Sequence, residues 1–314
     1  MLVNLVPDFL AVLAAPDPAA AYHGYLDHHQ PILRSYWTNY VLDPESPHAA
    51  QVIDDALRAD RTDLQRVLEE MDVAGIAEDA LRRTLEVLDA DCPVDLYLTV
   101  GVGAANAGEL VVGGRGIAFV CLEHFTGRAN PETHGLGLAP ELLPLWIAHE
   151  VAHAVRYTSP TSRADLKQLI GDARGHYNYW DTGSRATLRE LVTNEGVAVA
   201  VSQIVAPGFE PWVYLGFTRR QYRRCRELDT FLRRATAEEL EQRGLGLRLK
   251  YLAGGTRPGA RLAGGKVVPE RSGYYLGARL VEPFLAEAGV AATVRASARE
   301  LQRAEERALG VQSA

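Results

Sequence analysis

Length, composition and charge narrow the kind of protein that this chain of 314 residues can form. A hydrophobic content of 47% is enough to bury one large core or two smaller ones, which indicates a folded globular protein. The formal net charge of -7 gives no overall attraction to nucleic acids or to anionic membrane surfaces. We therefore expect neither a nucleic acid nor a membrane as a partner.

The cysteines and the N-terminal residues indicate the cellular compartment in which the protein is expected. Cys92, Cys121 and Cys225 are an odd number at wide spacing, which indicates neither a disulfide framework nor a cysteine zinc site. Residues 1–18 are apolar but lack a basic start, and Asp8 interrupts them, so we expect a folded amphipathic segment and not a signal peptide. No uninterrupted apolar run approaches the roughly 18 residues of a membrane-spanning helix. These features predict a cytoplasmic protein.

Helical periodicity dominates the first ninety residues. Apolar positions recur at three and four residues in AYHGYLDHHQPILRSYWTNY, HAAQVIDDALRAD, RTDLQRVLEEMDVAG and AEDALRRTLEVLDAD. Three short β-rich runs bounded by glycine follow between Val94 and Phe125, and they predict a small antiparallel sheet. We expect an N-terminal helical subdomain, residues 1–92, and a second domain, residues 93–314.

The remainder of the chain again has the pattern of helices. The predicted helices cover residues 142–157, 187–205 and 218–241, and two more begin near Gly273 and Ser297. Residues 254–272 are rich in Gly, Pro and Arg and have no periodicity, which predicts a long mobile loop. The fold class that follows is α+β, mostly helical, with the small sheet packed on the helix over residues 142–157.

That helix contains the string AHEVAHAVR, residues 148–156. Residues four apart on a helix are separated by about 40° around its axis, so His149 and His153 project from one face and can reach one cation. Glu150 lies beside that face, as in the HExxH pattern of zinc peptidases. Two hydrogen-bonded histidines without a metal are the alternative. The apolar flanks LPLWIA and VAHAVRY favour a metal, because buried polar groups without partners are costly.

A catalytic zinc usually takes three protein ligands and leaves one position for water. Glu195, in the apolar helical segment TLRELVTNEGVAVAVSQ, is the best third ligand, with an arginine ion pair as its alternative role. Glu190 and Glu123 are weaker candidates. Glu190 is five positions before Glu195 and so points to a different face.

The string HEVAH followed by Asn194-Glu195-Gly196-Val197-Ala198 resembles the gluzincin group of zinc metallopeptidases, which have HExxH and a downstream NEGxA glutamate. Arg156, the segment TLRELVTNEGVA and SGYYLGARLVEPFL are similar to a bacterial domain-of-unknown-function family described as predicted zinc-dependent proteases. The resemblance covers roughly Val94 to Leu309. It implies a zincin-like catalytic domain, a Zn²⁺ cofactor, Glu195 as the third ligand and a peptide or protein substrate.

The resemblance also implies roles around the metal. Glu150 would activate the metal-bound water as general base and return the proton to the leaving amine. Tyr274, in the Gly-Tyr-x-x-Gly motif, is the first candidate for an oxyanion donor, and Tyr275 is the second. Arg156, one turn after His153, is expected to form a structural ion pair.

Two departures from the family's pattern leave a second function open. Val199 stands where the family often has an acidic residue, and Ala278 stands where it often has an aromatic one. We expect a zinc-dependent endopeptidase or aminopeptidase. The alternative is a metal-binding sensor or regulator with little or no hydrolysis. For the peptidase, we also expect an edge strand of the sheet between residues 94 and 125 to lie along the cleft and to pair with an extended peptide.

Overall fold

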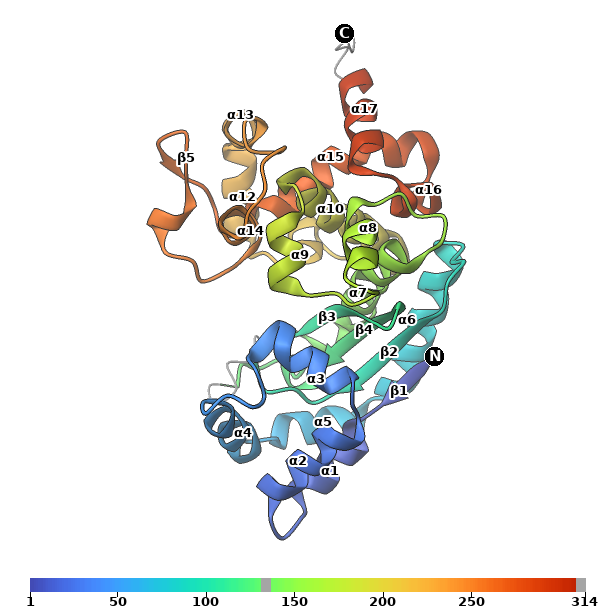
Figure 1. Cartoon of the computed structure of the whole chain (residues 1–314), viewed down its shortest axis with the longest axis vertical. Coiled ribbons are helices and arrows are strands. Elements are labelled where there is room, and N and C mark those ends of the chain that lie inside the picture. Colours follow the sequence, from blue (N-terminus) through green and yellow to red (C-terminus); the bar gives the residue numbers. More distant parts are fainter. Residues whose placement is uncertain (131–136, 309–314) are drawn as a thin grey trace.

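The first ninety residues form short helices around an aromatic and aliphatic core, as their periodicity predicts. The computed structural model describes residues 1–130 and 137–308. These first helices are Val6–Leu13 (α1), Pro18–His28 (α2), Ile32–Tyr36 (α3), the π-helix Trp37–Val41 (η1), Ala49–Arg58 (α4), Thr62–Glu70 (α5) and Val73–Val87 (α6). The Asp17 side chain caps α2 by accepting from the Ala20 amide, and Asp72 caps α6 in the same way. Helices α1 to α5 lie on one side of the sheet (Figure 1).

The sheet has four strands in the order β1-β2-β4-β3. They are Leu2–Asn4 (β1), Val94–Thr99 (β2), Ala107–Val112 (β3) and Arg115–Cys121 (β4). Only β3 and β4 are antiparallel, whereas β2 runs parallel to both β1 and β4. The expected all-antiparallel sheet was therefore wrong, and the sheet is mixed.

The reason lies in the burial of the strands. The hairpin β3–β4 forms through Gly113 and Gly114, which both have positive φ. Residues 116–121 of β4 are all buried, which suits a central strand with a neighbour on each side. Residues 100–106 form a connection long enough to pass the position that β4 occupies beside β2, so β3 becomes the edge strand.

Strand β1 comes from the first ninety residues but pairs with β2. One continuous hydrophobic cluster also includes Phe9 and Trp37 of the N-terminal helices and Leu96 and Val151 of the later elements. The boundary expected at residue 92 therefore falls within one sheet and one core. The division of the chain into two domains stays a prediction.

Helices make up most of the chain after the sheet. They are Leu143–Thr158 (α7), Asp165–Asp172 (α8), Tyr179–Arg185 (α9), Leu188–Val205 (α10), Pro211–Tyr214 (α11), Arg219–Glu227 (α12), Asp229–Ala237 (α13), Leu245–Leu252 (α14), Ser272–Ala288 (α15), Val290–Arg295 (α16) and Ala298–Ala308 (α17), with the 3-10 turns Leu122–His124 (η2), Pro140–Leu142 (η3) and Pro258–Arg261 (η4). The predicted basic helix over residues 218–241 is interrupted at Leu228 and forms α12 and α13. Within the described ranges, no helix has both the length and the apolar character needed to cross a membrane.

Residues 254–272 contain short elements of secondary structure, whereas the sequence predicted a long loop there. They contain η4 and a small hairpin of Leu262–Ala263 (β5) and Lys266–Val267 (β6). The Arg261 guanidinium donates to the Val268 carbonyl, and the Val268 side chain is fully buried, so the segment has a local anchor. Mobility of this segment stays a prediction.

Helix α7 lies across the sheet and contacts β4 and β3 on one side and α10 on the other (Figure 1). Helix α10 in turn packs on α15 where glycines of both helices meet. A Cβ atom added to Gly196 would lie 2.1 Å from the carbonyl oxygen of Gly277. Only glycine allows two helix backbones to approach this closely. The glycines of NEG and of Gly-Tyr-x-x-Gly therefore set the distance between α10 and α15.

Candidate metal centre

Helices α7 and α10 bring three potential metal ligands together. His149 and His153 project from the same face of α7, and both Nε2 atoms face one oxygen of Glu195 on α10. The distances to Glu195 Oε2 are 3.2 Å from His149 and 3.5 Å from His153. One ligand atom from each of the three residues lies within 4.8 Å of the other two. The group that the sequence selected can therefore hold a metal ion.

The electrostatics of this group depend on the Glu195 carboxylate beside two buried imidazoles. Burial alone would lower the pKa of His153, but the Glu195 carboxylate and more distant carboxylates raise it to about 9. Burial lowers the pKa of His149. Burial alone would raise the pKa of Glu195, but the charge of His153 and hydrogen bonds from both imidazoles hold it well below its usual range. Glu195 is therefore ionised.

Ring packing holds the two imidazoles in position. The His149 ring lies 5.5 Å from Trp146 and 6.3 Å from Tyr274, and the His153 ring lies nearly parallel to Tyr157 at 6.0 Å. Within the described part of the chain, Nδ1 of each histidine has no hydrogen-bond partner. The rings are therefore oriented by aromatic neighbours and not by hydrogen bonds at Nδ1, which many metal-binding histidines use.

Glu150 lines the same cavity as the three ligands and is 5% exposed. Burial raises its pKa well above the usual value, and the carboxylate of Glu109 adds to the effect. A raised pKa makes a carboxylate a stronger proton acceptor, as a general base requires.

Sequence reasoning missed Glu109, which lies on β3 and lines this cavity. Its Oε1 accepts from the Tyr157 hydroxyl at 3.1 Å, and its Oε2 accepts from the Tyr40 hydroxyl at 3.0 Å. The Asn194 side-chain amide donates to the same Tyr157 hydroxyl at 2.9 Å. A single acid in the apolar run GELVV was the available signal, since an isolated buried charge in a strand calls for partners.

The two tyrosines of the Gly-Tyr-x-x-Gly motif point to different places. Tyr274 lines the metal cavity, nearly parallel to the His149 ring. Burial and then the Glu195 carboxylate raise the pKa of Tyr274, so its hydroxyl keeps its proton. Tyr275 lines another cavity, and its hydroxyl donates to Asp229 at 2.9 Å. Tyr274 is therefore the one placed to act at the metal centre.

The edge strand β3 lies beside the metal centre, as expected, because Ala107, Gly108 and Glu109 line its cavity. Part of this edge is already occupied, however. The Glu109 amide donates to the Tyr40 hydroxyl, which donates to the Glu109 carbonyl, and the Tyr177 amide donates to the Val111 carbonyl. Among residues 1–130 and 137–308, no further backbone partner lies on this side of β3 at Ala107, where the strand starts.

The weaker ligand candidates lie elsewhere. The Glu190 carboxylate accepts from the Arg156 guanidinium at 3.1 Å and 3.3 Å, and both side chains are fully buried. Arg156 also donates to the carbonyls of Val294 and Ala296. The expected structural ion pair of Arg156 is confirmed, and it joins α7, α10 and α16.

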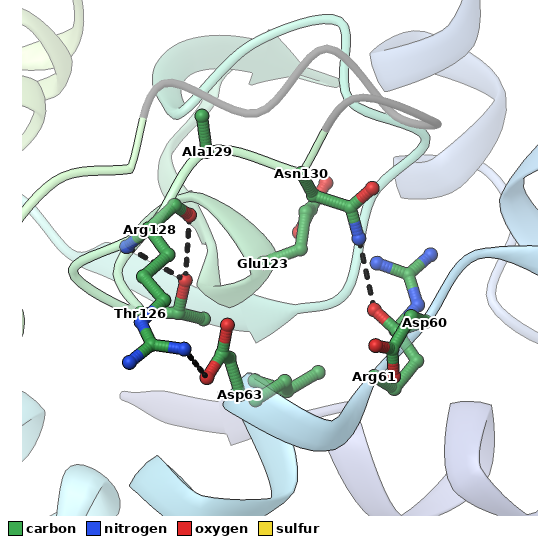
Figure 2. A pocket seen from close by; sticks show the side chains of 9 residues that line it. Asp60, Arg61, Asp63, Glu123, Thr126, Arg128, Ala129 and Asn130 are labelled. Carbon is green, nitrogen blue, oxygen red and sulfur yellow. Dashed lines mark hydrogen bonds and ion pairs between the residues drawn. The ribbon is translucent and has the colours of Figure 1, made fainter.

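Glu123 accepts from the amides of Gly101 and Gly103, at 2.9 Å and 3.2 Å. Figure 2 shows the cavity that it lines, with Asp60, Arg61, Asp63, Thr126 and Arg128 among its neighbours. None of the three metal ligands lines that cavity. Glu123 is therefore not part of the metal group.

Val199 and Ala278, the two departures from the family's pattern, line the same cavity as Tyr275. That cavity and the metal cavity have no lining residue in common among those that the structure describes. The departures therefore do not alter the immediate surroundings of His149, Glu150 and Glu195.

No family model, curated protein or solved structure matches this chain. The resemblance to gluzincin peptidases therefore stays a prediction that rests on the motif residues. What the structure adds is their placement in one group, in which both histidines are buried and Glu195 is half-buried.

Proposed function

We propose that this protein is a zinc-dependent peptidase with a zincin-like catalytic domain. The observation that carries the proposal is that His149, His153 and Glu195 converge in a cavity that also contains Glu150 and the start of an edge strand. Two imidazole nitrogens and one carboxylate oxygen are a donor set of catalytic zinc sites, which use three protein ligands. The half-buried, ionised Glu195 fits such an ion better than it fits an apolar core.

The residues of the chain have separate roles in this proposal. Bound zinc supplies a Lewis acid that activates water and polarises a carbonyl group. Glu150 takes a proton from the attacking water at its carboxylate and passes it to the leaving amine as the C–N bond breaks. The Tyr274 hydroxyl donates a hydrogen bond to the oxyanion that forms at the carbonyl.

The cavity also has groups that fit a peptide backbone. Asn106 Nδ2 and Trp146 Nε1 are buried donors that line it and have no hydrogen-bond partner within residues 1–130 and 137–308. A peptide carbonyl would satisfy either donor. An extended peptide would also pair with the open backbone at Ala107, at the start of β3.

Metal analysis and peptide cleavage test the proposal together. Purified protein is expected to contain one zinc per chain, and Glu195→Ala is expected to lose it. Glu150→Gln is expected to keep the zinc and lose cleavage of a mixed peptide library. Glu238→Gln is the matched control, because Glu238 is an exposed glutamate at the end of another helix. This variant is expected to keep both the zinc and the peptide cleavage.

Three results would contradict the proposal. Full zinc occupancy in Glu195→Ala would remove Glu195 as a ligand, and unchanged turnover in Glu150→Gln would remove the general base. Zinc binding without cleavage of any peptide by the wild-type protein would favour the metal-dependent sensor.

A further inference from the structure

We propose that the metal cavity recognises a carboxylate group of the substrate through Arg248 and Arg271, which deepens the proposed peptidase function and rests on it. Both arginines line the cavity that contains His149, Glu150 and Glu195. Arg248 comes from α14 and Arg271 from the residue before α15, so two separate elements bring guanidinium groups to one place.

Arg248 is 5% exposed, yet it has no carboxylate partner among the described residues. Its Nη1 donates to the Tyr179 carbonyl at 2.9 Å and its Nη2 to the Tyr177 hydroxyl at 3.1 Å. Its Nε atom is buried without any hydrogen-bond partner in that part of the chain. Neutral oxygens and the Tyr179 ring, whose centre lies 3.4 Å from the guanidinium, hold Arg248 in place without a direct carboxylate partner.

Arg271 is also without an ion pair in the described ranges. Its guanidinium lies 4.3 Å from the centre of the Tyr274 ring and donates to the Gly216 carbonyl at 3.2 Å. The backbone of Arg271 is left-handed, with φ 55°, which costs a side-chain-bearing residue free energy. Such strain is concentrated at functional sites. In this protein the left-handed residue lies directly before α15, and its guanidinium lies beside Tyr274.

Two buried cations elsewhere in the described residues have carboxylate partners. Arg156 pairs with Glu190, and Lys250 pairs with Glu239 at 2.8 Å. A buried cation without an opposite charge is costly, so a structure that leaves one in a cavity implies that an anion enters the cavity. Arg248 differs from these two cations because it has no carboxylate partner among the described residues, which indicates a ligand.

The charges in the cavity agree with this inference. A divalent cation would balance the carboxylates of Glu150 and Glu195. Among the described lining residues, Glu109 then supplies one negative charge against the two positive charges of Arg248 and Arg271, which leaves one positive charge in excess. Glu109 forms no ion pair with either arginine, and it already accepts from two tyrosine hydroxyls.

A carboxylate suits two guanidinium groups because their N–H donors bind both of its oxygens. The carboxylate can be the C-terminal group of a peptide or the side chain of an aspartate or glutamate next to the cleaved bond. Both sources present the same carboxylate group, and the substrate series below distinguishes between them.

Four fluorogenic peptides of one sequence test the inference. They combine a free or amidated C-terminus with glutamate or glutamine beside the bond to be cleaved. Wild-type protein is expected to cleave at least one carboxylate-bearing peptide with a kcat/KM at least about tenfold above the neutral peptide. A preference that follows the C-terminus identifies the terminal carboxylate, and one that follows glutamate identifies the side chain.

Arg271→Met is the main variant because Arg271 is only partly buried, and its thermal unfolding is recorded as a check on folding. The ratio of kcat/KM between carboxylate-bearing and neutral peptides is expected to fall to about one in Arg271→Met. This ratio is expected to persist in Arg223→Met, which replaces an exposed arginine on α12. Arg271→Lys is expected to keep only part of it, since lysine lacks the two-pronged donor geometry.

A binding measurement separates this inference from the proposed function. The affinity of zinc-loaded Glu150→Gln for the four peptides is measured by fluorescence anisotropy, with and without Arg271→Met. Tighter binding of a carboxylate-bearing peptide that Arg271→Met abolishes supports the inference even if the wild type cleaves nothing. Equal binding and equal cleavage of all four peptides, or no binding at all, overturns it.

Discussion

Gly277 lies against the backbone of Val192, so closely that an added Cβ atom would be 1.8 Å from the Val192 carbonyl oxygen. Gly277 belongs to α15, and Val192 belongs to α10, three residues before Glu195. This contact fixes the helix that carries Tyr274 against the helix that carries Glu195, the third potential metal ligand. The position of Tyr274 relative to the metal centre therefore depends on the absence of a side chain at residue 277.

Gly277→Ala is expected to lower the free energy of unfolding by at least about 2 kcal/mol, because the two helices must move apart to accommodate the methyl group. Chemical denaturation measures this change. Gly24→Ala is the matched control, since Gly24 lies within α2 and has open space around its Cβ position. There we expect a gain of up to about 1 kcal/mol from helix propensity. Equal effects at both positions would refute the role of the close contact.

Zinc uptake by the metal-free protein is expected to release a proton from His153 at pH 7. Its pKa is raised to about 9, so the imidazole is protonated below that pH, whereas a metal binds the neutral ring. The apparent zinc affinity should therefore rise about tenfold per pH unit as the pH approaches 9. Calorimetry in two buffers with different ionisation enthalpies counts the protons. Glu150→Gln should still show the release, which assigns the proton to the ligand group and not to the general base.

Tyr274→Phe is expected to lower kcat by about 10²- to 10³-fold with little change in KM or zinc content, as for the loss of an oxyanion donor. Tyr275→Phe provides the comparison at the neighbouring position. It should lose only the hydrogen bond to Asp229, at a cost of about 1 kcal/mol in stability, and keep its turnover. Steady-state kinetics of the two variants decide the assignment. Wild-type turnover in both would leave zinc and another group to stabilise the oxyanion.

Arg156→Met is expected to destabilise the fold by about 3–5 kcal/mol, because it leaves the Glu190 carboxylate buried without a cation. The double variant Arg156→Met/Glu190→Met should recover part of that loss, since an apolar pair needs no charge compensation. Thermal and chemical unfolding of the three proteins give the comparison. If the double variant is as unstable as the single one, the loss of stability comes mainly from the unpaired carbonyls of Val294 and Ala296. The unpaired charge of Glu190 would then be the smaller effect.

The metal group was predictable from sequence because helix geometry alone places His149 and His153 on one face. Glu195 followed from the need for a third ligand within an apolar helix, and its helix begins where predicted, at the capping residue Thr187. The sequence ranked Tyr274 before Tyr275 only through its place in the Gly-Tyr-x-x-Gly motif and gave no geometric reason for that order. Neighbouring positions on a helix differ by about 100°, and only the packing of α15 on α10 decides which of the two faces the metal.

The sheet topology and the substrate side of the cavity were harder to predict. Local strand patterns contain no information about which strand becomes central, and the three residues of β1 are too few to show alternation. Glu109, Arg248 and Arg271 come from three distant segments, and none belongs to a short motif. Only tertiary contacts bring them to His149.

The Tyr40 hydroxyl joins the N-terminal third of the chain to this site, since it bonds both the backbone and the side chain of Glu109. A fragment that starts at residue 93 would lack both this tyrosine and β1. The free sides of β2 and β3 would then be available to strands of other molecules. We expect such a fragment to aggregate on expression, so biochemical work on the metal centre requires the N-terminal helices as well.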